Sequence, residues 1–141
     1  MGAAQIHDKY GKAVLDKAFG TRFSTKDCSF KFNGNDKQAG IARIDGILDG
    51  EIAVEIESRA SKQVRGALLD LAFHPMKKKL LVVIKKHGNE ITPIQAEVIL
   101  TRLCGDNSKF KVVKFEGSGD EKRFNIDVQK IKNAVEELIT D

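Results

Sequence analysis

The sequence has few of the residues on which several protein classes depend. Its 141 residues include 2 Cys and 3 His, with no CxxC pair and no ordinary spacing of zinc ligands. We therefore expect a protein of the reducing cytoplasm in which Cys28 and Cys104 need not pair. There are 2 Pro, 1 Tyr and no Trp, which disfavours a proline-rich linker and an aromatic platform for stacking single-stranded nucleic acid.

Long hydrophobic runs are also absent. The longest, Leu80–Ile84, is too short to cross a bilayer, and the N-terminal residues lack the apolar stretch of a secretory signal. We expect neither a membrane-spanning nor a secreted protein. The formal net charge of +4 permits a polyanionic partner without requiring one. With 41% hydrophobic residues and no internal repeat, the chain is typical of one domain over residues 1–141.

The spacing of apolar residues predicts an α/β domain with a mixed sheet. Lys79–Ile84 shows no alternation, which indicates a central parallel strand joined to the strand before it by a helix, as a right-handed crossover. The other predicted elements are helices over residues 4–19, from about 58 to Pro75, from Thr92 to near Gly105 and around 128–139, with strands at Ser29–Asn33 and Phe110–Phe115.

The segment Ile41–Glu57 holds two alternating stretches on either side of Asp49-Gly50, which is a hairpin signal. A two-residue loop there would mix core and charged side chains on one face. An odd-length loop, for instance 48–50, separates them. It places Ile44, Ile52, Val54 and Ile56 on one face, and Arg43, Asp45, Glu55 and Glu57 on the other.

This register predicts that three carboxylates lie together. Glu55 and Glu57 share a face because they are two apart in a strand, and Asp45 joins them from the neighbouring strand. A hard divalent cation, Mg²⁺ or Mn²⁺, would relieve their repulsion and could promote phosphodiester hydrolysis. The alternative is that these carboxylates form a solvated face of a hairpin.

The run Ile44-Asp45-Gly46, a turn, Val54-Glu55-Ile56-Glu57, a helix and a buried strand resembles the PD-(D/E)xK, or restriction-endonuclease-like, nuclease superfamily. The resemblance implies a restriction-endonuclease-like core, with Asp45, Glu55 and the backbone carbonyl of Ile56 as metal ligands. The third signature position, usually Lys, is Glu57 here. The resemblance then implies that the next helix could supply the missing group from Lys62, Gln63 or Arg65.

Basic residues near this predicted site are candidates for phosphate contacts. They are Lys62, Arg65, Lys85, Lys86 and His87, of which the last three follow the buried strand at the end that carries Glu57. The run Lys77–Lys79 is expected to be solvated at the opposite end. Leu69 and Phe73 give the second helix another apolar side, which predicts either a core contact with the first or last helix or a homodimer interface.

The sequence thus predicts a metal-dependent nuclease acting on DNA, with no organic cofactor. A first alternative is a catalytically inactive nuclease-like subunit that binds DNA or protein, favoured by Glu57 at the usual Lys position. A second is a structural α/β domain whose carboxylates are merely solvated.

Overall fold

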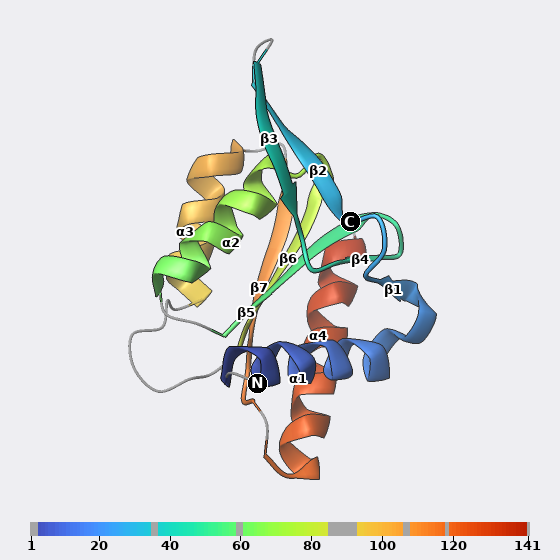
Figure 1. Ribbon diagram of the computed structural model, residues 1–141. Coiled ribbons are helices and arrows are strands. Elements are labelled where there is room, and N and C mark those ends of the chain that lie inside the picture. Colours follow the sequence, from blue (N-terminus) through green and yellow to red (C-terminus); the bar gives the residue numbers. More distant parts are fainter. Residues whose placement is uncertain are drawn as a thin grey trace.

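A computed structural model describes residues 3–34, 37–58, 61–84, 93–105, 108–117 and 119–140. At residues 3–8, 32–34, 37–40 and 61–63 it describes the backbone only. Helices and strands alternate over most of the chain (Figure 1). The helices are α1 (Ala3–Phe19), the short 3-10 helix η1 (Gly20–Arg22), α2 (Ser61–Phe73), α3 (Pro93–Cys104) and α4 (Glu121–Ile139). The strands are β1 (Phe23–Ser24), β2 (Ser29–Gly34), β3 (Lys37–Arg43), β4 (Gly46–Leu48), β5 (Ile52–Glu57), β6 (Lys78–Ile84) and β7 (Lys109–Phe115).

A mixed five-stranded sheet with the order β1-β4-β5-β6-β7 forms the centre of the molecule. β4 runs antiparallel to β1 and β5, whereas β5, β6 and β7 are parallel. The predicted α/β class with helices flanking a mixed sheet is confirmed. β6 lies between two parallel neighbours and is buried on both faces, which explains why its sequence is apolar without alternation.

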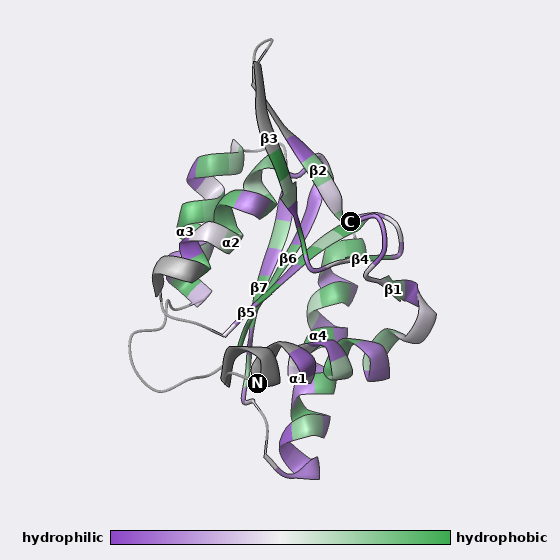
Figure 2. Ribbon diagram, in the orientation of Figure 1, coloured by the Kyte–Doolittle hydropathy of each residue, from purple (hydrophilic) through white to green (hydrophobic). Residues whose placement is uncertain are grey.

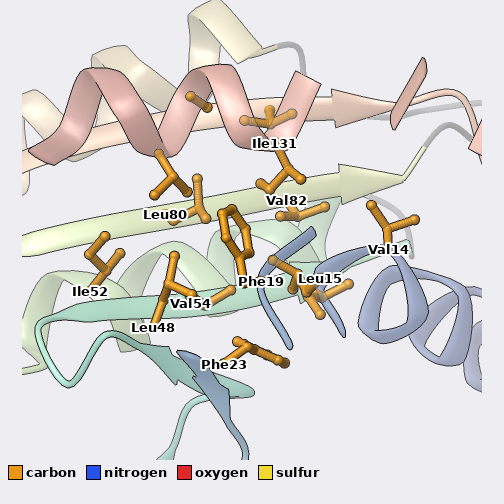
Figure 3. Close-up of a cluster of buried hydrophobic side chains, with 14 of the residues drawn as sticks. Val14, Leu15, Phe19, Phe23, Leu48, Ile52, Val54, Leu80, Val82 and Ile131 are labelled. Carbon is orange, nitrogen blue, oxygen red and sulfur yellow. The ribbon is translucent and has the colours of Figure 1, made fainter. Parts of the chain in front are cut away.

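Each face of this sheet carries its own apolar core. On one face the sheet packs against α1 and α4, with Phe19, Leu48, Val54, Val82 and Ile131 among the buried residues (Figure 3). On the other face it packs against α2 and α3, around Leu68, Leu71, Leu81 and Leu100. Hydropathy colouring shows that α2 and α3 alternate apolar and polar segments (Figure 2). None of the helices in the described part of the chain is long and apolar enough to cross a membrane.

The β4–β5 connection confirms the odd-length loop. Leu48 pairs with Ile52, so the loop is Asp49–Glu51, one residue later than the example of 48–50. Asp49 and Gly50 both adopt positive φ, at 56° and 68°, as a tight hairpin turn requires. The side chain of Arg22 forms a double hydrogen bond with the Asp49 carboxylate, at 2.7 and 2.8 Å, which holds this turn in place.

The prediction that Ile44 shares a face with Ile52 and Val54 is wrong, because the chain changes sheets directly after Ile44. The N–H of Ile44 donates to the carbonyl of Cys28, alongside the β2–β3 pairing, whereas the N–H of Asp45 donates to the carbonyl of Val54 in the central sheet. Ile44 therefore packs in the core beneath α2 and α3, while Ile52 and Val54 lie in the opposite core. β2 and β3 form a two-stranded sheet of their own, and β1 is a short strand that the sequence did not predict.

The prediction that Lys77–Lys79 is solvated is wrong for Lys79, which is 2% exposed. Its ammonium donates to the carbonyls of Leu71, Ala72 and His74, at 2.5, 3.1 and 3.0 Å. These carbonyls lie at the C-terminal end of α2, where a helix leaves acceptors unpaired and favours a positive charge. Burial lowers the pKa of Lys79. The run does lie at the opposite end of β5 from Glu57, because Lys78 pairs with Ile52.

Candidate active site

Asp45 stands where the chain enters the central sheet, and its backbone forms a local irregularity. Gly46 pairs with Val54, and the N–H of Asp45 also donates to the Val54 carbonyl at 3.1 Å. Asp45 and Gly46 thus both lie opposite Val54, as in a β-bulge. A bulge changes the direction of a side chain at the end of a ladder. Gly46 is needed here, because a Cβ on it would lie 2.4 Å from the ring of Phe23 in β1.

Asp45 and Glu55 are held together by reciprocal hydrogen bonds. The N–H of Asp45 donates to Oε1 of Glu55 at 2.8 Å, and the N–H of Ile56 donates to Oδ2 of Asp45 at 2.7 Å. Each carboxylate is therefore fixed by the backbone of the other strand, with few rotamers left to it. The structure brings these two predicted residues into one site.

Glu55 is buried rather than solvated. It is 7% exposed, and Glu57 is 4% exposed, because α2 and α3 cover this face of the sheet. The alternative of a solvated hairpin face is therefore wrong. Burial raises the pKa of Glu55 to about 9, and the negative charges of Asp45 and Asp70 add to the shift.

Asp70, in the C-terminal half of α2, is the site residue that sequence reasoning missed. Burial raises its pKa, and the charge of Asp45 raises it further. The signal was present, since Asp70 is the single carboxylate between Ser61 and Phe73. What the sequence could not show is that the crossover helix carries Asp70 back over the strand that bears Glu55.

Glu57, for which the resemblance would expect Lys, points to the same face as Glu55, two residues further along β5. Its Oε1 accepts a hydrogen bond from the N–H of Ser58 at 3.1 Å. In the described part of the chain, no group of three or more His, Cys, Asp or Glu side chains could hold a metal ion. The predicted meeting of three carboxylates is thus reduced to the pair Asp45 and Glu55, and the charge of Asp70 acts on Glu55.

The ligands that the resemblance names nevertheless suit a hard cation. Within an antiparallel ladder, the N–H and the carbonyl of one residue point to the same neighbouring strand. Because the N–H of Ile56 reaches Asp45, its carbonyl is directed to that same edge, beyond the first residue of β4. Two carboxylates and one carbonyl are the kind of oxygen ligands that Mg²⁺ and Mn²⁺ prefer.

The remaining predicted site residues are only partly placed. Arg65 is exposed on the surface of α2. Lys62 and Gln63 belong to the first turn of α2, but their side chains lie outside the described part of the molecule, as do residues Lys85, Lys86 and His87 altogether. Leu69 and Phe73 are 45% and 54% exposed on α2, across the sheet from α1 and α4. The predicted core contact with those helices is therefore wrong.

A second buried carboxylate, Asp127 of α4, is 0% exposed on the opposite side of the sheet. Its Oδ2 accepts from the hydroxyl of Tyr10 at 2.5 Å and from the N–H of Gly117 at 3.2 Å. Its Oδ1 accepts from the N–H of Glu116 at 2.8 Å. These donors join α1, α4 and the residues after β7, so this carboxylate holds the fold together.

The Asp45–Glu55 pair differs, because charges of its own sign surround it. A cation bound at this site would be stabilised by the carboxylates. It would favour the ionised form of Glu55 and offset the repulsion between Glu55, Asp45 and Asp70. No protein-family model, no curated protein and no solved structure matches this chain.

Proposed function

We propose that this protein is a divalent-metal-dependent nuclease that hydrolyses phosphodiester bonds in DNA, with a restriction-endonuclease-like core. The observation that carries the proposal is the pairing of the half-buried Asp45 with the buried Glu55, because burial and then the charges of Asp45 and Asp70 raise the pKa of Glu55 to about 9. A buried carboxyl group with a strongly raised pKa is typical of functional sites. The order of the elements supports it too, because a crossover helix and a parallel strand follow the strand that bears Glu55.

In this proposal, Asp45, Glu55 and the carbonyl of Ile56 hold Mg²⁺ or Mn²⁺. The ion would hold a phosphodiester oxygen and lower the pKa of a water molecule. The chain's own contribution is to fix both carboxylates through the N–H groups of Asp45 and Ile56, at 2.8 and 2.7 Å. Asp70 adds negative charge that favours a cation, and Glu57 stands where a basic group is usual.

The basic and polar residues around the pair complete the proposal. We assign Gln63 and Arg65 of α2 as the helix contribution to catalysis, and Lys62, Arg65, Lys85, Lys86 and His87 as phosphate contacts. The exposed side chains of Leu69 and Phe73 would join two copies of the chain, so that two sites could act on two strands of a duplex.

The test is cleavage of supercoiled plasmid, linear duplex and branched DNA with Mg²⁺, with Mn²⁺ or with EDTA. Asp45→Asn and Glu55→Gln keep the shape of each side chain and remove the charge, while Glu97→Gln removes a carboxylate from the exposed surface of α3. We expect metal-dependent cleavage by the wild type and by Glu97→Gln, and none by the two site variants. Cleavage in EDTA, or equal cleavage by folded Glu55→Gln, would exclude the proposed mechanism.

A second candidate is a nuclease-like subunit that binds DNA without cutting it. Glu57 at the usual Lys position favours it. Metal-dependent thermal stabilisation separates this candidate from a purely structural domain, because a ligand that binds only the folded chain raises its stability. A folded wild type that binds DNA and cuts no substrate with Mg²⁺ or Mn²⁺ would establish this second candidate.

A further inference from the structure

The two-stranded sheet of β2 and β3 extends beyond the end of the central sheet (Figure 1). Its strands pair with each other alone among the described strands, through Ser29 with Arg43, Phe30 with Ala42 and Lys31 with Ile41. An isolated pair of strands is marginally stable unless one face packs on something. We call this element the β2–β3 ribbon.

The ribbon has one face against the body and one in solvent. Phe30 is 7% exposed, and its ring meets the ring of His74 edge to face, with centroids 5.0 Å apart, at the end of α2. Side chains of paired residues point to the same face and alternate along each strand. Lys31, Ile41 and Arg43 therefore share the outer face, where Ile41 is 73% exposed.

The described part of the outer face is basic. Lys31 and Arg43 are exposed on it, and Lys26 is exposed in the loop before β2. Arg43 uses one of its donors for the carbonyl of Thr25, at 3.1 Å, which leaves the rest of its fork toward solvent. Lys26 and Arg43 also line a shallow hollow at the base of the ribbon, together with Asp27. Its charge suits a polyanion.

We propose that the β2–β3 ribbon is an arm that binds duplex DNA, with Lys31 and Arg43 on backbone phosphates. This inference rests on the proposed function for its choice of substrate. Two strands about 4.8 Å apart, with their side chains, match a major groove about 12 Å wide, which admits a two-stranded ribbon. The major groove of duplex RNA is too narrow for side chains to read.

Single-stranded nucleic acid fits this surface less well. Non-specific binding of single strands depends on aromatic side chains that stack on bases. Phe30, the described aromatic residue of the ribbon, is buried against the body. The described side chains of the outer face are cations and the aliphatic Ile41, so phosphate contact along a duplex is the binding mode that they support.

The ribbon leads directly into the candidate site. Arg43 precedes Asp45 by two residues, which places their Cα atoms about 7 Å apart at most in an extended chain. The charges of Arg43 and Asp45 both act on the buried thiol of Cys28, with opposite effects on its pKa, which is raised mainly by burial. A duplex held by Arg43 would therefore lie beside the carboxylates that are proposed to act on it.

The test measures the affinity for a short fluorescent DNA duplex in EDTA, where cleavage cannot interfere, at about 50 to 200 mM salt. The variant is Lys31→Ala with Arg43→Ala, and the matched control is Lys122→Ala with Arg102→Ala, both of which are exposed on other elements. We expect the ribbon variant to bind about tenfold more weakly or worse, with a slope of log affinity against log salt smaller by about 2.

Two further variants keep the result interpretable. Lys31→Ala alone leaves the Arg43 contact with Thr25 in place and should reduce the slope by about 1, whereas Arg43→Lys should retain most of the affinity. Wild-type affinity and slope in the double variant would overturn the proposal. Tighter wild-type binding to single-stranded DNA or to duplex RNA than to duplex DNA would overturn it as well.

The experiments distinguish failure of the DNA-binding proposal from failure of the nuclease proposal. If the wild type binds duplex through Lys31 and Arg43 but cuts nothing with Mg²⁺ or Mn²⁺, the arm stands and the nuclease proposal fails. If Asp45→Asn abolishes cleavage while the ribbon variant binds and cuts like the wild type, the nuclease proposal stands and the arm fails.

Discussion

Glu55 and Asp127 are both buried carboxylates, one on each side of the central sheet, and their surroundings are opposite. Asp127 accepts hydrogen bonds from Tyr10, Glu116 and Gly117. Glu55 accepts one from the N–H of Asp45, and the charges of Asp45 and Asp70 act on it as well. Three hydrogen-bond donors stabilise the carboxylate of Asp127, so it serves the fold. Neighbouring negative charges disfavour the ionised form of Glu55, and a bound cation would offset them.

The buried cation Lys79 extends this contrast. It lies on the same face of the sheet as Glu55, and carbonyls at the end of α2 accept the three hydrogen bonds of its ammonium. The protein therefore satisfies buried charges where they serve the fold. Glu55 differs, because it accepts one backbone hydrogen bond while the charges of Asp45 and Asp70 act on it, and this difference identifies Asp45 and Glu55 as the candidate site.

The largest effect should come from removing the scaffold charge. In Asp127→Asn one carboxylate oxygen becomes an amide NH₂, which cannot accept the hydrogen bonds that Tyr10, Glu116 and Gly117 donate. We therefore expect the free energy of unfolding to fall by about 3 kcal/mol. Urea denaturation at neutral pH measures this change. Glu121→Gln, an exposed carboxylate in the first turn of the same helix, should change stability by about 0.5 kcal/mol or less. Equal effects of both variants would mean that Asp127 is not a structural charge.

The opposite sign is expected at the candidate site. Glu55→Gln replaces a carboxyl that burial and like charges keep from ionising, so it should raise the free energy of unfolding by about 2 kcal/mol at pH 8 without metal. The same urea measurement applies, with Glu97→Gln as the exposed control. A clear loss of stability in Glu55→Gln would show that the carboxylate is satisfied in the fold, and the contrast with Asp127 would disappear.

The pH dependence of stability sharpens the comparison. In the unfolded chain Glu55 ionises near the ordinary glutamate pKa of 4.5, whereas in the folded protein it holds its proton up to about 9. The folded state then binds one more proton at Glu55 between these values, so the contribution of Glu55 to the free energy of unfolding is greatest below pH 4.5 and is lost as pH rises toward 9.

The expected fall from this one group is up to about 1.4 kcal/mol per pH unit, which amounts to at most about 2.7 kcal/mol between pH 6 and pH 8. The difference between wild type and Glu55→Gln isolates it, because His74, whose pKa burial lowers, is present in both proteins. Parallel pH profiles of the two proteins would contradict the raised pKa of Glu55.

Much of the framework could be predicted from the sequence, because local patterns determine it. The unbroken apolar run of β6 indicated a strand covered on both faces, and the alternation around Asp49-Gly50 predicted an odd-length loop. The pairing of Glu55 with Asp45 follows from that parity. These features depend on neighbours within one hairpin or one crossover.

What the sequence could not predict depends on long-range placement. The change of sheets between Ile44 and Asp45 depends on Cys28, far back in the chain, which takes the hydrogen bond of Ile44. Lys79 belongs to a run of three lysines that is typical of a solvated segment, and only the position of the end of α2 over it explains its burial. Asp70 likewise becomes a site residue only when α2 returns over β5.

The smallest effect expected here is that of Tyr10→Phe, which removes one donor from Asp127 and leaves two backbone donors in place. We expect a loss of about 1 kcal/mol, since a buried carboxylate with two remaining bonds is still largely satisfied. Spectrophotometric titration gives a second readout, because burial and the charge of Asp127 raise the pKa of the single Tyr of the chain above its usual range. In Asp127→Asn that titration should move back toward lower pH. A loss as large as that of Asp127→Asn would mean that Tyr10, rather than the backbone N–H groups, stabilises the Asp127 carboxylate. The difference between Asp127 and Glu55 would then depend on one side chain.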